Sequence, residues 1–156
     1  MNRTTFDSPI GKLEICEESG KITRIEIVSG ENFSPETKTP LLLEAKKQLS
    51  EYFSGKRKSF DFPIEFSGTE FQKSVWRELL KIPFGETKTY GEIAAAIGKP
   101  KAARAVGSAC NKNPIPIIVP CHRVIGANGK LTGFACGTEV KEWLLCHEEK
   151  QKGEQK

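Results

Sequence analysis

The sequence has no apolar run close to the roughly 20 residues that a membrane-spanning helix needs. It also has no apolar signal region, because Met1 to Asp7 are mostly polar. We therefore expect a protein that is neither inserted into a membrane nor secreted, and that stays in the cytoplasm.

Histidine and cysteine are too few, and too poorly spaced, for a disulfide framework or a zinc site. The chain holds five cysteines, an odd number, and no two of them stand at a Cys-x-x-Cys spacing. Only two histidines are present, and one of them, His122, directly follows Cys121. An adjacent cysteine and histidine cannot complete a tetrahedral site alone, so we expect free thiols in a reducing compartment and no metal.

Acidic residues are missing between Glu92 and Glu139. Scattered lysines and arginines can form a merely solvated surface, but so long an acid-free stretch favours an anionic partner such as nucleic acid. Residues 66–150 hold twelve basic and eight acidic residues, whereas residues 1–65 are nearly balanced. The basic residues in the acid-free stretch are Lys99, Lys101, Arg104, Lys112, Arg123 and Lys130.

The first 65 residues predict a small α/β domain. Apolar and charged residues alternate on both sides of a turn at 17–20, which predicts a strand pair within residues 4–28. A helix is expected from Pro40 to Phe53, with an apolar stripe of Leu42, Ala45, Leu49 and Phe53. Residues 60–66 also alternate, but Pro63 restricts them to an edge strand or an extended linker.

Residues 66–150 predict a second domain that is mainly helical, followed by a polar tail at 151–156. A capping box at Thr69 opens a helix that is expected to continue until Pro83. A second capping box at Thr89 opens a helix over 90–97, and a glycine turn separates it from a helix at about 101–110. This order is typical of a helix-turn-helix, although a plain helical hairpin fits these signals equally well.

The third of these helices is unusually thin for a DNA-reading helix. Alanine, glycine and serine dominate residues 102–109, and Arg104 is the only long side chain in its middle. A helix that reads the major groove needs several side chains aimed at base edges. The composition instead favours close approach to a minor groove, with affinity that comes from the phosphates.

Cys121 is the strongest candidate for a nucleophile. Three prolines at 114, 116 and 120 enforce an extended path through an apolar segment that ends at this cysteine. A rigid segment holds a reactive atom in one place, and the neighbouring His122 and Arg123 can favour the thiolate.

The last predicted helix covers residues 138–150. Val140, Trp143, Leu144 and His147 form an apolar stripe that we expect to face the core. Glu148 lies on an adjoining face, where it either points inward towards His122 or is solvated near the helix end.

These motifs together resemble the methylated-DNA–protein-cysteine methyltransferase family, the O6-alkylguanine-DNA alkyltransferases. The resemblance covers about residues 69–148 and depends on Pro-Cys-His-Arg-Val at 120–124, Asn-Pro at 113–114, Arg-Ala-Val-Gly at 104–107, Tyr90 and Lys-Glu-Trp-Leu-Leu at 141–145. It implies an α/β N-terminal domain, with a ribonuclease-H-like small sheet plus helix, followed by a mainly α winged helix-turn-helix domain. It also implies a cytoplasmic protein of bacterial or archaeal type.

The resemblance assigns roles to residues that the motifs share. Cys121 would accept the alkyl group, His122 would act as its base through a water, Glu148 would orient His122, and Asn113 would brace the loop. Tyr90 would rotate the phosphate and protonate the leaving base, and Arg104 would fill the gap left by the flipped guanine. Backbone groups near Val124 and Ala135 would bind the base, and we expect the base pocket to include Cys110 and Cys136 as well. Among the basic residues of the acid-free stretch, we expect Lys99, Lys101 and Arg123 to contact DNA.

The implied activity is a single, irreversible transfer from O6-alkylguanine, and from O4-alkylthymine, to a cysteine of a monomeric protein. The displacement needs a thiolate and a proton donor but no cofactor. Binding to double-stranded DNA would depend little on sequence. The family commonly has Tyr-x-Gly-Gly where this chain has Phe-Ala-Cys-Gly at 134–137, so we expect bulky alkyl groups to fit less well.

Three other functions fit the sequence less well than this one. A non-catalytic lesion sensor lacks the nucleophile that Cys121 supplies. A transcription regulator needs base-reading side chains that residues 102–109 lack. A cysteine hydrolase would turn over, whereas a thioether product would not be released.

Overall fold

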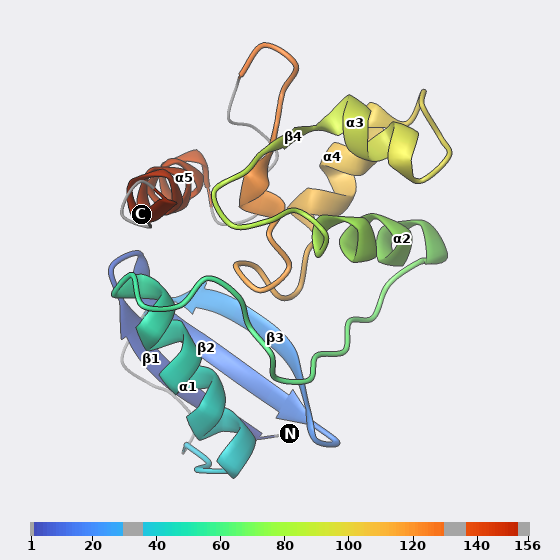
Figure 1. Cartoon of the computed structure of the whole chain (residues 1–156). Helices are drawn as coiled ribbons and strands as arrows, with labels where there is room; N and C mark the ends of the chain where they lie inside the picture. The colour runs from blue at the N-terminus through green and yellow to red at the C-terminus, as the bar shows by residue number, and fades with distance from the viewer. Residues whose placement is uncertain (1, 30–35, 130–136, 153–156) are drawn as a thin grey trace. The chain divides into compact units, whose positions relative to one another are not determined.

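A computed structural model describes residues 2–29, 36–129 and 137–152 of the chain (Figure 1). These residues form two compact units, Met1–Ser67 and Gly68–Lys156. None of the helices within the described ranges is long and apolar enough to cross a membrane.

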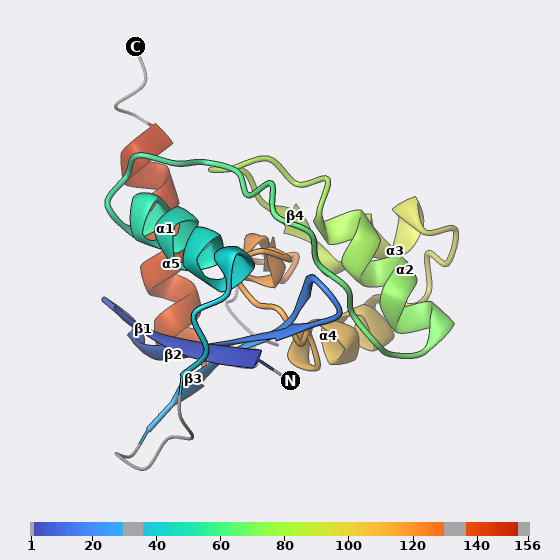
Figure 2. The ribbon, with the colours of Figure 1, turned by 90° about the horizontal axis from the view of Figure 1, so that it is seen from below.

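The first unit is a three-stranded antiparallel sheet covered by one helix. The strands β1 (Asn2–Ser8), β2 (Gly11–Glu18) and β3 (Lys21–Val28) pair in the order β1-β2-β3. The helix α1 (Pro40–Phe53) lies along one face of this sheet (Figures 1 and 2). The expected strand pair is therefore β2 and β3, and the expectation of only two strands was wrong. β1 escaped notice because it is largely polar and only Thr4 in it is buried.

The helix α1 begins and packs as its sequence predicts, with one change. Thr39 caps it by accepting a hydrogen bond from the Leu42 backbone N–H at 3.1 Å. The buried stripe ends at Tyr52, which is fully buried, and not at the expected Phe53. Tyr52 lies three residues after Leu49 and four after the equally buried Gln48, so the buried face is centred between these two residues and Phe53 lies at its edge.

The segment 60–66 is extended, as predicted, and touches the sheet at one point. The Ile22 N–H donates to the Pro63 carbonyl, and the Glu65 N–H donates to the Ile22 carbonyl, both at 2.9 Å. Pro63 contributes only a carbonyl, which is what a residue without an N–H can offer at a sheet edge.

The second unit contains the helices α2 (Glu70–Leu79), α3 (Tyr90–Ala96), α4 (Ala103–Asn111) and α5 (Thr138–Lys152), together with a short 3₁₀ helix η1 (Cys121–Arg123). The helices α2, α3 and α4 pack against one another, and the Trp76 indole N–H fastens α2 to α4 by donating to the Ala109 carbonyl at 2.9 Å. Both predicted capping boxes, at Thr69 and Thr89, are present. A small sheet domain followed by a mainly helical domain confirms the expected fold class.

The helix α2 ends earlier than predicted. It stops at Leu79, four residues before Pro83. The chain then tightens: the Lys81 N–H donates to the Glu78 carbonyl, and the Ile82 N–H donates to the Leu79 carbonyl. Bonds between residues three apart replace the α-helical pattern here, as often happens at a helix end.

Two very short strands bring the start of α3 beside the segment that follows the candidate nucleophile. β4 (Lys88–Thr89) pairs in parallel with β5 (Val124–Ile125), in the register Lys88 to Val124. Since Tyr90 directly follows β4 and η1 directly precedes β5, this pairing places two segments far apart in the sequence next to each other.

Candidate active site

The segment that leads to Cys121 has a tightly defined path. Ile117 adopts a φ of 77°, a conformation that is rare for a β-branched residue and that persists only where the surroundings enforce it. Pro120 then makes a sharp turn that lets the Cys121 N–H donate to the Val119 carbonyl at 2.8 Å. The predicted extended path is wrong: the Val119 N–H donates to the Ile115 carbonyl at 2.9 Å, so the segment folds into a turn before Cys121, since prolines exclude a helix but favour turns.

Asn113 binds both ends of this loop. Its side-chain oxygen accepts from the Ile115 N–H at 2.9 Å, and its Nδ2 donates to the Val119 carbonyl at 2.8 Å. The same Nδ2 donates to the Cys121 Sγ at 3.2 Å. A donor aimed at sulfur favours the thiolate over the thiol. Asn113 therefore braces the loop and also faces the candidate nucleophile.

His122 and Glu148 form a buried pair next to Cys121. The His122 Nε2 lies 2.5 Å from the Glu148 Oε2, and both side chains are almost completely buried. Burial lowers the pKa of His122, although the nearby Glu148 charge opposes this effect. A neutral ring whose Nε2 donates to a carboxylate carries its accepting lone pair on Nδ1, so the imidazole is prepared to take up a proton there.

Glu148 points inward, which resolves the alternative left open by the sequence. Its carboxylate accepts from His122, from Arg123 and from the Gly85 backbone N–H, the last at 3.2 Å. These partners hold the pKa of Glu148 far below its ordinary value in spite of burial, which by itself would raise it. The carboxylate is therefore ionised.

Arg123 does not lie where a DNA contact requires. Its side chain is only 7% exposed, and its Nε and Nη2 donate to the two Glu148 oxygens at 2.7 and 3.1 Å. Its Nη1 donates to the Ile82 carbonyl at 2.7 Å. The prediction of a phosphate contact at Arg123 was wrong, because the guanidinium is enclosed by these partners.

The buried face of α5 differs from the predicted stripe. Lys141, Leu144 and Glu148 are buried, whereas Trp143 and His147 are only partly covered. Val140 is likewise partly exposed. The three buried residues follow helical spacing, but two of them are charged, and charged residues are rarely buried without partners. Because the apolar pattern does not count charged residues, it predicted a face of α5 that lies next to the buried one.

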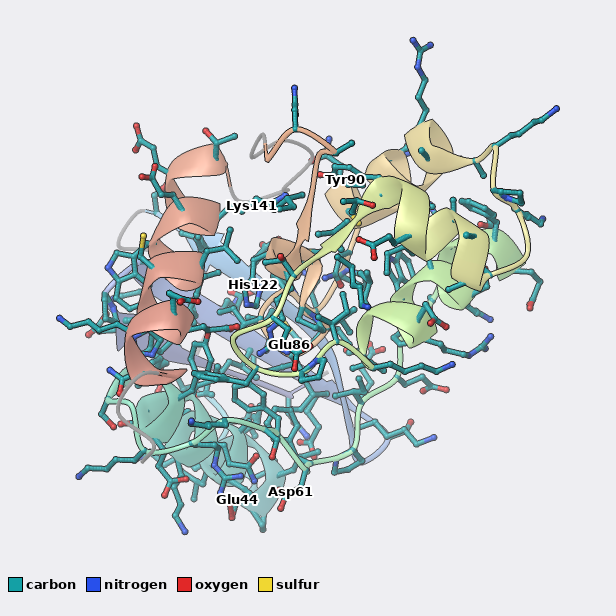
Figure 3. All side chains as sticks on the ribbon, turned by 45° about the horizontal axis from the view of Figure 1, so that its top comes forward. Glu44, Asp61, Glu86, Tyr90, His122 and Lys141 are labelled. Atoms are coloured by element: carbon teal, nitrogen blue, oxygen red, sulfur yellow. The ribbon has the colours of Figure 1, made fainter. Side chains whose placement is uncertain are left out.

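Lys141 is a site residue to which the sequence analysis assigned no role. Its Nζ donates to the Tyr90 hydroxyl at 3.2 Å, and Figure 3 shows the two side chains reaching towards each other from α5 and the start of α3. The charges of Lys141 and Cys121 interact, and burial lowers the pKa of Lys141. Lys141 therefore connects the candidate nucleophile with the candidate proton donor. Its place in the shared motif at 141–145 was the only signal in the sequence.

The remaining predicted site residues divide between an exposed and a buried set. Lys99, Lys101, Arg104 and Lys112 are exposed on or beside α4. Val124 and Cys110 are buried, and burial raises the pKa of Cys110 to about 12, so this thiol stays protonated at neutral pH. Ala135, Cys136 and Lys130 lie outside the described residues.

Comparisons with known proteins agree with this arrangement. A family model described as "6-O-methylguanine DNA methyltransferase, DNA binding domain" matches residues 70–150, and one described as the ribonuclease-like domain of the same protein matches residues 1–66. The methylated-DNA–protein-cysteine methyltransferase of Methanosarcina acetivorans is 52% identical over 150 residues, which are 93% of this chain and 96% of the relative. The constitutive enzyme of that name from Bacillus subtilis is 49% identical and covers 91% of this chain and 92% of its own length.

Solved structures give the same result. The crystal structure of the Mycobacterium tuberculosis O6-methylguanine methyltransferase has a TM-score of 0.86 and 46% identity, and the match covers 96% of this chain and 93% of that one. The Mycobacterium tuberculosis OGT protein in complex with DNA has a TM-score of 0.88 at the same identity, with 97% and 94% covered. Since family models match both units and close relatives match nearly the whole chain, the chain belongs to the methylated-DNA–protein-cysteine methyltransferase family.

Proposed function

We propose that this protein repairs DNA by transferring the alkyl group of O6-alkylguanine, and of O4-alkylthymine, irreversibly to Cys121. The observation that carries the proposal is the Asn113 donor 3.2 Å from the Cys121 sulfur, together with the buried pair of the adjacent His122 and Glu148, all in the second unit. A thiolate held in this way is a soft nucleophile suited to displacement at a saturated carbon.

The transfer is an in-line displacement with a balanced proton path. The Cys121 thiol gives its proton to His122 by way of a water, and ionised Glu148 stabilises the resulting imidazolium. The sulfur then forms a bond to the alkyl carbon as the bond from that carbon to O6 breaks, and the electron pair passes to the guanine. Tyr90 donates the proton that the departing base needs, and Lys141 supplies the positive charge beside the Tyr90 oxygen.

The product, a thioether, makes the protein a single-use reagent. No group among the described residues near Cys121 is arranged to cleave a carbon–sulfur bond, so each molecule reacts once. This distinguishes the protein from a cysteine hydrolase, and the presence of Cys121 distinguishes it from a lesion sensor that only binds.

The lesion reaches Cys121 only if the base leaves the helix. Cys121 is fully buried, so an alkylated base must leave the duplex and enter the second unit. The exposed Arg104 on the thin helix α4 is the side chain that would occupy the space left in the stack. A relative of the same fold has been solved in complex with DNA, which supports DNA binding by this chain.

Arg104→Ala is expected to slow repair of a lesion in duplex DNA by roughly tenfold or more, since flipping costs a few kcal/mol that an inserted side chain offsets. Reaction with the free alkylated base should be nearly unchanged, because no flipping is needed. Single-turnover rates on both substrates measure the difference. Equal losses on the two substrates would contradict the role of Arg104.

Binding to unmodified duplex should depend steeply on salt and little on sequence. Four candidate phosphate contacts stay exposed, so the slope of log K against log salt is expected near about −3 to −4. Duplexes of unrelated sequence should bind within several-fold of one another, with the protein acting as a monomer. Fluorescence anisotropy across a salt series checks both points. One sequence bound about a thousandfold more tightly would favour a transcription regulator instead.

A further inference from the structure

The Arg123 side chain is hydrogen-bonded within the protein and not directed towards DNA. Its fork meets Glu148 through two parallel hydrogen bonds, a geometry that fixes both the position and the plane of the carboxylate. Its third nitrogen is bonded to the Ile82 carbonyl, and its guanidinium carbon lies 5.8 Å from the centre of the Phe84 ring. Each of the three guanidinium nitrogens therefore has a hydrogen-bond acceptor.

The segment after α2 completes the enclosure of Glu148. Ile82 and Phe84 hold Arg123, while the Gly85 N–H donates directly to the Glu148 Oε1. Each carboxylate oxygen then accepts from at least two groups, namely Oε1 from Arg123 and Gly85, and Oε2 from Arg123 and His122. A carboxylate held by three residues from two parts of the chain, the segment after α2 and η1, presents one fixed orientation to the His122 ring.

The charged groups around His122 have opposite effects on its protonation. The negative Glu148 of α5 favours the imidazolium, whereas the positive Arg123 of η1 and Lys141 of α5 disfavour it. The segment after α2 contributes a carbonyl, an N–H and an aromatic ring rather than a charged contact. Arg123 and Glu148 together are neutral, so the resting imidazole is adjacent to a dipolar pair and not to a lone carboxylate.

We propose that Arg123 is a positioning residue for alkyl transfer, which orients Glu148 against His122 and whose positive charge keeps the resting imidazole ready to accept the Cys121 proton. This inference rests on the proposed function. It assigns to Arg123 a second effect beyond packing. Without its positive charge, the Glu148 carboxylate would keep His122 and the neutral Gly85 N–H as partners, and the His122 ring would hold a proton before Cys121 could release one.

The test is the pH dependence of single-turnover alkyl transfer for wild type, Arg123→Met and Arg123→Lys. In Arg123→Met the acidic limb of the rate profile should move up by about one pH unit or more, because a neighbouring like charge on His122 has been removed. Arg123→Lys keeps the positive charge but cannot donate two parallel hydrogen bonds to Glu148. The midpoint of its acidic limb should therefore lie close to that of wild type, while its transfer rate should be lower at every pH. Arg77→Met, at an exposed arginine of α2, should match wild type throughout.

A second readout does not depend on activity. The chain has two histidines, so nitrogen-labelled histidine gives NMR signals for only His122 and His147. The midpoint of the His122 titration should move to higher pH in Arg123→Met, with the His147 signals as the internal reference. If wild type fails to transfer alkyl groups, the proposed function is wrong, and this titration still decides whether Arg123 governs His122.

The outcomes separate positioning from packing. An Arg123→Met protein that is less stable, but whose pH midpoint and His122 titration match wild type, overturns the proposal in favour of a structural role. If Arg123→Met does not fold, the pH profile of Arg123→Lys decides between positioning and packing. A wild-type rate across the whole pH range in that variant overturns the proposal, and a uniformly lower rate with an unshifted midpoint supports it.

Discussion

Cys121→Ala is expected to abolish alkyl transfer completely, while duplex affinity stays nearly unchanged. The substitution removes the sulfur that accepts the Asn113 hydrogen bond and that belongs to the residue directly before His122, the partner of Glu148. The candidate phosphate contacts are exposed on or beside α4, so the loss of a buried thiol should leave them in place. Mass spectrometry after incubation with O6-methylguanine duplex measures the transfer, and anisotropy measures the binding.

Two other cysteines serve as matched controls. Cys146→Ala, at an exposed position on α5, should transfer as wild type does. Cys16→Ala, at a buried thiol of β2 whose pKa is raised to about 11, should also transfer as wild type does. Residual transfer in Cys121→Ala would mean that another thiol is the acceptor.

Glu148→Gln is expected to destabilise the second unit by about 3–5 kcal/mol and to slow alkyl transfer severely. The change leaves the buried Arg123 guanidinium without its carboxylate, and breaking one side of a buried ion pair costs about this much. It also removes the charge that stabilises the His122 imidazolium. Both tryptophans, Trp76 and Trp143, belong to the second unit, so urea unfolding followed by tryptophan fluorescence reports on this unit.

The same prediction has a pH dependence with a definite sign. The pKa of Glu148 is lowered in the folded protein, so its stabilising contribution is present above its ordinary value of 4.5 and is lost as the pH falls towards the folded value. Burial lowers the pKa of His122 below 6.5, so the unfolded chain takes up this proton first and stability also falls below about that pH. In Glu148→Gln the loss of stability below pH 4.5 should be smaller than in wild type.

Glu149→Gln is the control for that experiment, because Glu149 is the exposed neighbour of Glu148 on the same helix. It should leave both stability and transfer within error of wild type. A Glu148→Gln protein as stable as Glu149→Gln, with an unchanged acid profile, would contradict the buried ion-pair network.

The sequence predicted those features whose signals are local. Capping residues predicted the starts of α2 and α3, and three prolines excluded a helix before Cys121 but did not predict the turn that the chain forms there. The pairing of His122 with Glu148 was one of two alternatives, because a helical glutamate at the edge of an apolar stripe can face either way. Its inward direction depends on partners that lie 25 and 63 residues away in the chain.

The features that the sequence did not predict depend on burial of charge. Arg123 looked like one more basic residue in an acid-free stretch, and only its contacts with Glu148 and Ile82 show why it is enclosed. Lys141 lies outside the predicted apolar stripe, although it is fully buried beside Tyr90. Charged side chains are rarely buried without a partner, and a partner distant in sequence leaves no local pattern.

The most direct test is the site and stoichiometry of alkylation in the wild-type protein. After reaction with excess O6-methylguanine duplex, intact mass and peptide mapping should show one added methylene per molecule, carried by the peptide that contains Cys121, together with restored guanine in the DNA. An adduct on Cys110, Cys136 or Cys146, or repair of many lesions by each molecule without any gain in protein mass, would contradict the proposed transfer to Cys121.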